Sequence, residues 1–311
     1  MRFGAQLWSQ ATSWPEFRDT VVAAEAAGWD SAWTWDHVLA IMGPWRQPIF
    51  EGWMALAGWG AVTSRIRLGL MVGANTFRNP GLTAKLATTL DHITNGRAIL
   101  GIGGAWFERE HEAHGMDFGS GIGERLDRLD EAVGLMRRLL DGEEFSYHGR
   151  FYRFHQVRQS PRPIQAHLPI LIGGSGPRKT LRTVAKYGDG WNTSGTLEQV
   201  AERLRILDEH CRDVGRDPAL IERTVSFPMV IRDDPREAEA VFAAQLAHNG
   251  LSEPPDVPLL LGPPAMFAER IRPYADLGFS TVIARLPAPY DRQTIDRISE
   301  VREALQRNGS R

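Results

Sequence analysis

Cysteine is almost missing from this chain of 311 residues: Cys211 is the only one, so no internal disulfide can form. A reducing compartment is therefore expected, and we predict a cytoplasmic location. No run of about 18 apolar residues occurs, so no membrane-spanning helix is predicted. Residues 1–8 also lack the pattern of a signal peptide. The formal net charge is -2 and no basic block is present, which argues against nucleic acid or an anionic membrane as a partner.

Several catalytic motifs with a fixed spacing are absent as well. The sequence contains no H-E-x-x-H helix and no G-x-S-x-G elbow, and its glycine-rich turn does not fit the G-x-G-x-x-G dinucleotide fingerprint. His111 and His114 are three residues apart but lack an accompanying set of carboxylates, so we predict no metal site. Cys211 falls inside an expected helix, which argues against a catalytic thiol.

Strand-like and helix-like segments alternate along the chain, and their length and composition suit one large core. The expected helices cover residues 15–27, 51–63, 79–90, 123–140, 177–187, 197–214 and 291–306. The expected strands cover residues 2–8, 31–35, 66–72, 97–102, 169–172, 190–192, 223–231 and 280–286. Eight strands alternating with helices match the α/β class and the (β/α)8 TIM barrel. We predict a single domain over residues 1–311, with a doubly wound open sheet as the alternative.

Two stretches interrupt this alternation. Residues 142–168 hold Gly, Pro, Tyr and Phe without a helical period, and residues 249–264 are rich in Pro, Leu and Gly. Because barrel active sites are built from the loops that follow the strands, we expect both insertions to shape a substrate pocket.

The ionisable pair Asp36-His37 ends the second expected strand. Active sites of α/β barrels lie where the strands finish. A histidine titrates near neutral pH, so His37 can move a proton or donate a hydrogen bond to a cofactor, with Asp36 orienting it or contacting a ligand. The alternative is a structural histidine beside an exposed aspartate.

The glycine-rich turn Gly173-Gly174-Ser175-Gly176 lies between an expected strand and an expected helix that opens at Pro177. Exposed backbone N–H groups at a helix start bind anions, and glycine allows a close approach. Arg178 and Lys179 add positive charge nearby. The turn therefore predicts a phosphate site, and the alternative is a tight turn without a ligand.

A third segment, Gly101 to Trp106, ends another expected strand in small residues and is followed by Glu110 and His111. Small residues can clear space for a planar ring; the alternative is glycine for packing, with Glu110 and His111 solvated. Eight of the ten tryptophans, Trp45 among them, lie within the first 60 residues. Ordinary packing accounts for most of them, and we predict that Trp45 and Trp106 line the substrate pocket.

Taken together, these segments resemble the luciferase-like monooxygenase superfamily, and most closely its coenzyme F420-dependent oxidoreductases. The resemblance rests on residues 33–37, 63–115 and 169–192. It implies a bacterial luciferase-like (β/α)8 barrel with the cofactor ring at the strand ends. It also implies coenzyme F420, a deazaflavin, as the cofactor, with FMN as the alternative.

The resemblance assigns roles to individual residues. Asp36 and His37 would lie beside the ring, with His37 near its reactive face as the candidate catalytic residue. Met71 and Val72 match the place of a non-prolyl cis peptide behind the ring. The remaining cofactor contacts implied are Gly104 and Ala105 near the ring or ribityl chain, Gly174, Ser175 and Gly176 at the phosphate, and Trp191 closing that end of the pocket.

One departure from the family bears on the substrate. The sugar-phosphate dehydrogenases of this group carry Gly-Thr-Gly-Glu, with the glutamate as proton donor, where this chain has Gly103-Gly104-Ala105-Trp106. A bulky, less polar substrate is therefore expected. The predicted function is hydride transfer between F420 and an unidentified small molecule. The alternatives are an FMN-dependent monooxygenase supplied by a partner reductase and a non-catalytic flavin-binding protein. The family also implies a homodimer.

Overall fold

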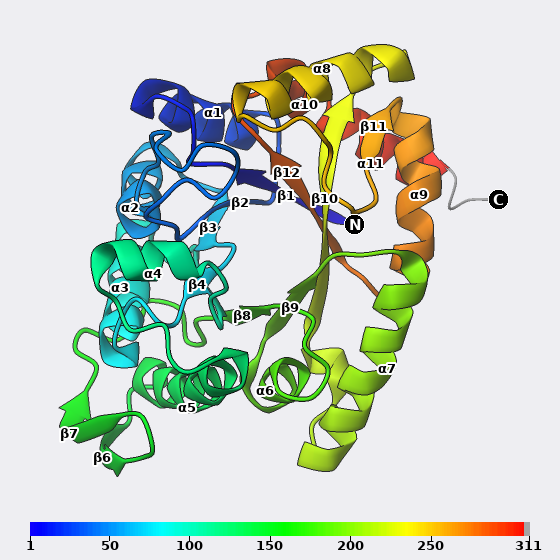
Figure 1. Ribbon diagram of the computed structural model, residues 1–311. Coiled ribbons are helices and arrows are strands. Elements are labelled where there is room, and N and C mark those ends of the chain that lie inside the picture. Colours follow the sequence, from blue (N-terminus) through cyan, green and yellow to red (C-terminus); the bar gives the residue numbers. More distant parts are fainter. Residues whose placement is uncertain (308–311) are drawn as a thin grey trace.

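The computed structural model describes residues 1–307, which are built around a closed barrel of parallel strands (Figure 1). The eight barrel strands in chain order are β1 (Arg2–Leu7), β2 (Ser31–Thr34), β3 (Arg67–Leu70), β5 (Ala98–Gly103), β8 (Ile170–Gly173), β9 (Gly190–Thr193), β10 (Glu222–Ile231) and β12 (Thr281–Leu286). β12 pairs in parallel with β1 and closes the ring. The predicted (β/α)8 barrel is confirmed.

Helices surround the barrel. They are α1 (Trp14–Ala26), α2 (Gly52–Val62), α3 (Pro80–Ile93), α4 (Glu108–His114), α5 (Ile122–Leu140), α6 (Thr180–Tyr187), α7 (Leu197–Val214), α8 (Pro235–His248), α9 (Pro264–Asp276), α10 (Arg292–Asp296) and α11 (Ile298–Arg307), with a 3-10 turn at Pro218–Leu220. α7 has the predicted bounds because Thr196 caps its first turn and Gly215 ends it in a left-handed conformation, φ 72°.

One helix start was predicted wrongly. The sequence places Pro177 as the first residue of a helix, but α6 begins at Thr180. The backbone N–H of Leu181 bonds to the carbonyl of Gly176, 3.1 Å away and five residues earlier, so residues 177–179 form a turn. The glycine-rich segment is therefore longer and more open than a direct strand-to-helix junction.

The two insertions differ from expectation. Residues 142–168 contain an antiparallel hairpin, β6 (Glu144–His148) and β7 (Arg153–Arg158), which lies beside α5 outside the barrel ring (Figure 1). The segment after it is fixed to α3, where the amide of Gln159 donates to the carbonyl of Ala84 at 3.0 Å. Residues 249–264 include β11 (Leu260–Gly262), which pairs with β10. Neither insertion lines the cavity described below, so the expectation that they shape it is wrong.

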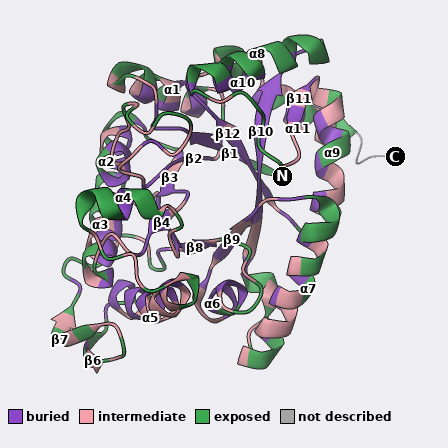
Figure 2. Ribbon diagram, in the orientation of Figure 1, coloured by how far each residue is buried: buried purple, intermediate pink, exposed green. Residues whose placement is uncertain are grey.

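The hydrophobic core has two parts. Most of it fills the space between the strands and the helices, and Figure 2 shows buried strands inside a ring of helices with exposed outer faces. A smaller cluster, called here the barrel plug, fills the interior of the barrel. Its members are Trp33, Met71, Ile99, Leu171 and Ile283, with Val72 packed against them. The plug closes the barrel below the carboxyl ends of the strands, which leaves that end free to hold a ligand.

Candidate active site

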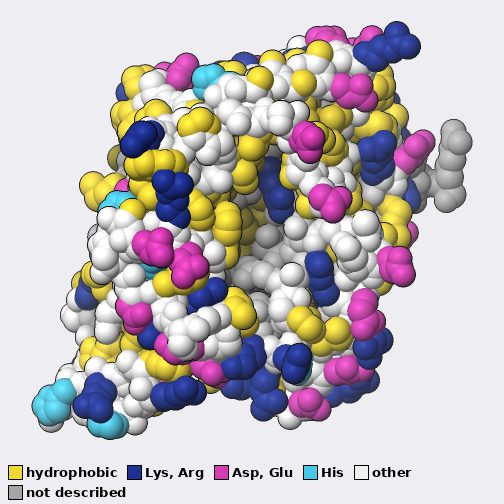
Figure 3. Space-filling view, in the orientation of Figure 1, with side chains coloured by type: hydrophobic (Ala, Val, Ile, Leu, Met, Phe, Trp, Pro, Cys, Tyr) yellow, Lys and Arg dark blue, Asp and Glu magenta, His cyan; other side chains and the backbone are white. Residues whose placement is uncertain are grey.

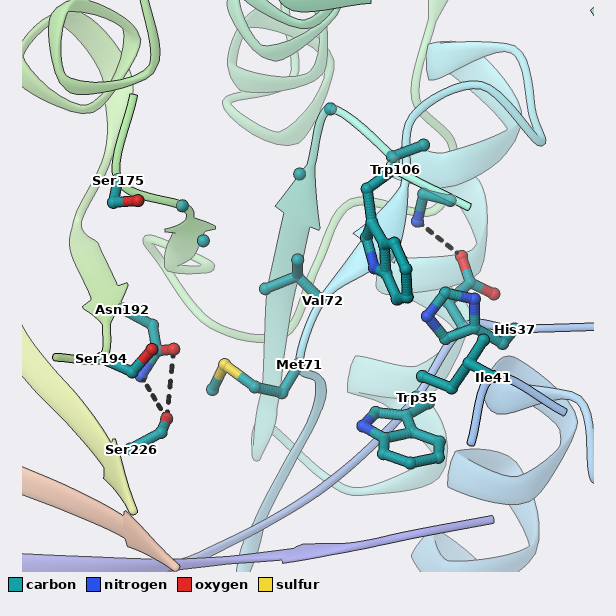
Figure 4. A pocket seen from close by; sticks show the side chains of 18 of the residues that line it. Trp35, His37, Ile41, Met71, Val72, Trp106, Ser175, Asn192, Ser194 and Ser226 are labelled. Carbon is teal, nitrogen blue, oxygen red and sulfur yellow. Dashed lines mark hydrogen bonds between the residues drawn. The ribbon is translucent and has the colours of Figure 1, made fainter. Parts of the chain in front are cut away.

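A cavity of about 610 Å³ opens at the carboxyl ends of the barrel strands. Figure 3 shows the corresponding hollow at the centre of this face. Residues in or directly after all eight barrel strands line it, from Gln6 in β1 to Arg285 in β12. The close-up separates two groups of side chains with Met71 and Val72 between them (Figure 4). On one side lie Trp35, His37, Ile41 and Trp106, and on the other Ser175, Asn192, Ser194 and Ser226.

His37 is held by a carboxylate. Its Nδ1 lies 2.9 Å and 3.1 Å from the two carboxylate oxygens of Glu110, which also accepts the backbone N–H of Val38 at 3.1 Å. Because a carboxylate only accepts hydrogen bonds, this contact assigns the Nδ1 hydrogen to His37. Within residues 1–307, Nε2 has no partner, so it is the nitrogen that can accept a proton from a ligand or return one.

Glu110 owes its position to α4. The side chain is only 1% exposed, and the next residue, His111, is fully buried. His111 bonds through Nε2 to the hydroxyl of Thr76 at 2.6 Å and through Nδ1 to the carbonyl of Phe107 at 2.9 Å. The bond to Thr76 fastens α4 to the loop after β4 (Gly73–Ala74), and the bond to Phe107 orients the imidazole against the first turn of α4. The reading of Glu110 and His111 as solvated residues is therefore wrong, and no spacing in the sequence indicated that Glu110 reaches His37.

Asp36 lines the same cavity, but its carboxylate is already engaged. Arg78 donates two hydrogen bonds to it, at 2.7 Å and 2.9 Å, and the backbone N–H of Ala74 donates a third at 2.9 Å. Burial raises the pKa of the Asp36 carboxyl, and Arg78 opposes that shift. Asp36 thus fixes the loops after β2 and β3, and it does not orient the imidazole of His37. Arg78 was not identified from the sequence.

The peptide bond between Met71 and Val72 is cis. The carbonyl of Met71 accepts a hydrogen bond from the side-chain amide of Gln6, 3.0 Å away across the barrel. Both Met71 and Val72 line the cavity, between the aromatic and the polar group (Figure 4). The backbone here forms a bulge against which a flat molecule can rest.

Glycines on the neighbouring strands make room for this bulge. A Cβ atom at Gly101 would lie 1.8 Å from the carbonyl oxygen of Leu70. Added Cβ atoms at Gly103 and Gly173 would lie 2.7 Å and 2.8 Å from the methyl groups of Val72. These contacts are shorter than a protein tolerates, so small residues at the end of β5 serve first to admit the protein's own backbone.

The glycine-rich turn forms the opposite end of the cavity. Gly174 has φ 131°, a conformation that favours glycine, and a Cβ there would lie 3.1 Å from the Thr180 side chain. A Cβ at Gly176 would lie 2.8 Å from the Thr180 hydroxyl oxygen. The turn is thus a cradle that side chains would fill, shortly before α6, and its small residues let a phosphate approach the backbone closely. Lys179 adds no free charge, since its Nζ lies 2.5 Å from Asp127.

Ten of the predicted site residues line this one cavity: Asp36, His37, Met71, Val72, Gly104, Ala105, Trp106, Gly174, Ser175 and Gly176. Two do not. Trp191 is fully buried on the outer side of β9, and its indole N–H donates to the carbonyl of Gly174 at 2.8 Å, so it supports the turn from behind. Trp45 packs against the guanidinium groups of Arg46 and Arg109, each 4.5 Å from its ring centroid. Placing these two residues in the pocket was therefore incorrect.

The polar wall beside the turn was also missed. The Asn192 side chain donates to the hydroxyl groups of Thr224 at 2.8 Å and Ser226 at 2.9 Å, which ties β9 to β10.

Among residues 1–307 no cluster of three or more His, Cys, Asp or Glu side chains could hold a metal ion. No helix in the same range is long and apolar enough to cross a membrane.

The sequence profile of the luciferase-like monooxygenase family matches residues 1–257. An uncharacterized protein of Mycobacterium tuberculosis is 35% identical over 54% of this chain, and the matched part spans 58% of that protein. The F420-dependent glucose-6-phosphate dehydrogenase of Intrasporangium calvum is 31% identical over 317 residues, 91% of this chain and 92% of that protein.

Among solved structures, an F420-dependent secondary alcohol dehydrogenase in complex with an F420–acetone adduct superimposes with a TM-score of 0.84. Its identity to this chain is 18% and the match covers 98% of both chains, so it supports the fold. The profile match covers more than half of the chain, and the dehydrogenase of I. calvum matches nearly all of it. The chain belongs to the luciferase-like monooxygenase family.

Proposed function

We propose that this protein is an oxidoreductase that exchanges a hydride between coenzyme F420 and a small organic substrate. The main observation in support is that a single cavity extends from His37 to the turn at Gly174–Gly176, across the bulge at Met71 and Val72. A flat ring with a phosphate-bearing tail could occupy all three parts at once. Relatives such as the dehydrogenase of I. calvum, which is named as F420-dependent, support the choice of cofactor.

The residues present fit such a cofactor. The cradle at Gly174 and Gly176 would take the phosphate, the bulge would support one face of the ring, and Gly104 and Ala105 would lie along its edge. When bound, the deazaflavin supplies a carbon that donates or accepts a hydride. The chain's own residues hold the ring, exclude water and place a substrate against it.

His37 is proposed as the residue that moves the proton accompanying the hydride. Glu110 holds its Nδ1, which leaves Nε2 to exchange a proton with the substrate. Glu110 is a positioning residue because it acts through His37. A carboxylate is therefore still part of the site, although Trp106 occupies the place of the glutamate in the sugar-phosphate dehydrogenases. Trp106, 60% exposed, makes the rim apolar and favours a less polar substrate than a sugar phosphate.

Fluorescence titration with purified F420 and with FMN tests the proposal. We expect the dissociation constant for F420 to be at least about tenfold lower than that for FMN. Stopped-flow absorbance should then show oxidation of reduced F420 by members of a panel of ketones, aldehydes and enones. Tighter binding of FMN, or binding of F420 without turnover on any substrate, would contradict the proposal.

A second candidate is an FMN-dependent monooxygenase that receives reduced flavin from a partner reductase. The name of the matched family favours it. Oxygen uptake that requires both reduced FMN and a substrate would support this activity, and F420 would have no effect on it. A non-catalytic flavin-binding protein predicts binding without turnover in either assay.

We further propose that the protein acts as a single-domain homodimer in the cytoplasm, alone or with an F420 or flavin reductase. The single, buried Cys211 supports a reducing compartment. Light scattering tests the dimer, and a mass equal to that of one chain would contradict it.

A further inference from the structure

Arg285 carries a charge into the interior of the barrel. On β12 it is in register with Gln6 of β1 and Pro228 of β10. Ile283, two residues earlier on the same strand, belongs to the barrel plug. Side chains alternate along a strand, so Arg285 points to the same inner side as Ile283, one layer nearer the mouth. Arg285 lines the cavity. Among residues 1–307, no other Lys or Arg side chain does so.

This guanidinium has no counter-charge. Among residues 1–307, the guanidinium of Arg285 has no hydrogen-bond or ion-pair partner, and the two acids that line the cavity are engaged with Arg78 and His37. Burial lowers the pKa of Arg285. By contrast, the buried guanidinium of Arg232 has Asp291 at 2.7 Å. The Arg285 side chain is half-buried and reaches the open space of the cavity, so an anion there could accept charge-assisted hydrogen bonds from a guanidinium that has no other partner.

Toward the mouth of the cavity, the wall on the β1 side of Arg285 is aromatic. Trp8 follows β1 two residues after Gln6 and thus lies one layer above Arg285. Its ring centroid is 4.5 Å from that of Trp35, and the Trp35 ring is 6.2 Å from His37. A molecule that enters from the mouth would therefore lie against Trp8 and Trp35 with its innermost end at Arg285.

The cofactor phosphate is a poor match for this charge. The turn at Gly174–Gly176 follows β8, whereas β9 and β10 separate β8 from β12 around the ring. The cradle at that turn is itself suited to the phosphate, and His37 follows β2, on the other side of Arg285. Arg285 therefore faces the space between the aromatic wall and the cofactor cradle, where a substrate would lie.

We infer that Arg285 binds a carboxylate on the substrate, and that the substrate class is an apolar, mainly aromatic or aliphatic, carboxylic acid or keto acid. This inference rests on the proposed function for its place in a reaction, but the binding of the acid can be measured without the cofactor. Arg285 is then the residue that sets specificity, because it anchors one end of the molecule while His37 serves the reacting end.

A matched pair of probes tests the inference: 4-phenylbutyrate and its neutral amide, 4-phenylbutanamide. Their affinities are measured by tryptophan fluorescence, with and without saturating F420. We expect the wild-type protein to bind the carboxylate at least about tenfold more tightly than the amide. Arg285→Met should abolish this preference and leave the amide unchanged, and Arg285→Lys should restore part of it.

Arg67→Met serves as the control, since Arg67 lies at the opposite end of the barrel and burial also lowers its pKa. It should keep the preference for the acid. Thermal unfolding of each variant confirms that it is folded, and Arg285→Lys stands in if the Met variant does not fold. Equal affinities in the wild type, no binding of either probe, or a preference that survives in Arg285→Met would each overturn the inference.

The cofactor affinity separates this inference from the proposed function. If Arg285→Met weakens F420 binding as much as acid binding, Arg285 serves the cofactor and the inference fails. If wild-type protein does not bind F420 but still prefers the acid through Arg285, the inference stands and the proposed function fails.

Discussion

Two histidine–carboxylate pairs stand at opposite ends of the barrel. At the carboxyl ends of the strands, His37 Nδ1 lies 2.9 Å from Glu110, and at the amino ends, His167 Nε2 lies 2.8 Å from Asp189. The geometries are alike but the surroundings differ. The side chains of His37 and Glu110 are 12% and 1% exposed, whereas those of His167 and Asp189 are 56% and 21% exposed. Burial in a cavity, and not the pair itself, marks the catalytic candidate.

The two ends of the barrel also differ in whether the charged side chains near each histidine–carboxylate pair have partners. At the amino ends, Asp189 also pairs with Arg137 at 2.7 Å, and Arg2 pairs with Glu222 at 2.8 Å. The cavity there is only about 50 Å³. At the carboxyl ends the cavity of about 610 Å³ keeps His37 Nε2 and Arg285 without partners among residues 1–307. At the amino ends these ion pairs stabilise the fold, and at the carboxyl ends the imidazole of His37 and the guanidinium of Arg285 stay open to a ligand.

Replacement of His37 should have the largest effect. We expect His37→Ala to lower kcat by about 10²- to 10⁴-fold, because general acid–base catalysis is lost. The matched variant His167→Ala should leave kcat unchanged. Steady-state kinetics with F420 compares the two, and an equal loss in both, or no loss in His37→Ala, would refute the proposed role.

Replacement of Glu110 should have the next largest effect on turnover. Glu110→Gln keeps an oxygen that can accept from His37 Nδ1 but replaces a charge-assisted hydrogen bond with a weaker neutral one, so kcat should fall about 10- to 100-fold. The dissociation constant for F420 should stay the same. An unchanged kcat, or a loss of F420 affinity as large as the loss of kcat, would contradict the positioning role of Glu110.

The corresponding change at the other end should affect stability and spare kcat. Asp189 accepts hydrogen bonds from Arg137 and from the backbone N–H of Ile170 at 2.8 Å. Asp189→Asn should therefore lower the free energy of unfolding by about 1–3 kcal/mol. Urea denaturation measures this loss. A large fall in kcat with normal stability would break the division between the two ends.

The smallest effect is expected at Glu25, which joins α1 to the start of β3. Burial raises the pKa of its carboxyl, but the backbone N–H groups of Ile66, Arg65 and Ser64 outweigh this and hold the pKa below its usual value. The lowered pKa contributes stability above the unfolded pKa of about 4.3, which is lost as pH falls through the folded pKa. Glu25→Gln should be destabilised at pH 7 by about 1 kcal/mol and should lose less stability than wild type on acidification below pH 5. Identical slopes of stability against pH would contradict this.

Much of the fold could be predicted because its signals are local. The expected strand over residues 280–286 corresponds to β12 at Thr281–Leu286, and α7 has the predicted bounds, since its capping residues are adjacent in sequence. The strand after residue 66 was less regular than predicted. β3 ends at Leu70 and the chain then bulges, which requires glycines from two other strands.

The site could be predicted only in part, because its contacts join distant segments. The pair His37–Glu110 spans 73 residues, and no spacing rule connects them. Trp191 was misplaced because a strand of four residues does not reveal which of its sides faces inward; Asn192 lines the cavity instead. Arg285 was missed for a related reason. Its guanidinium lacks an acidic partner because Asp36 and Glu110, the acids that line the cavity, contact Arg78 and His37 instead.

The most direct test of the account is a crystal structure of the protein with F420. The account predicts a phosphate at the turn of Gly174–Gly176 and a ring that rests on Met71 and Val72, with one edge beside His37. Binding of the ring outside this cavity, or of the phosphate at another site while the turn stays vacant, would contradict it.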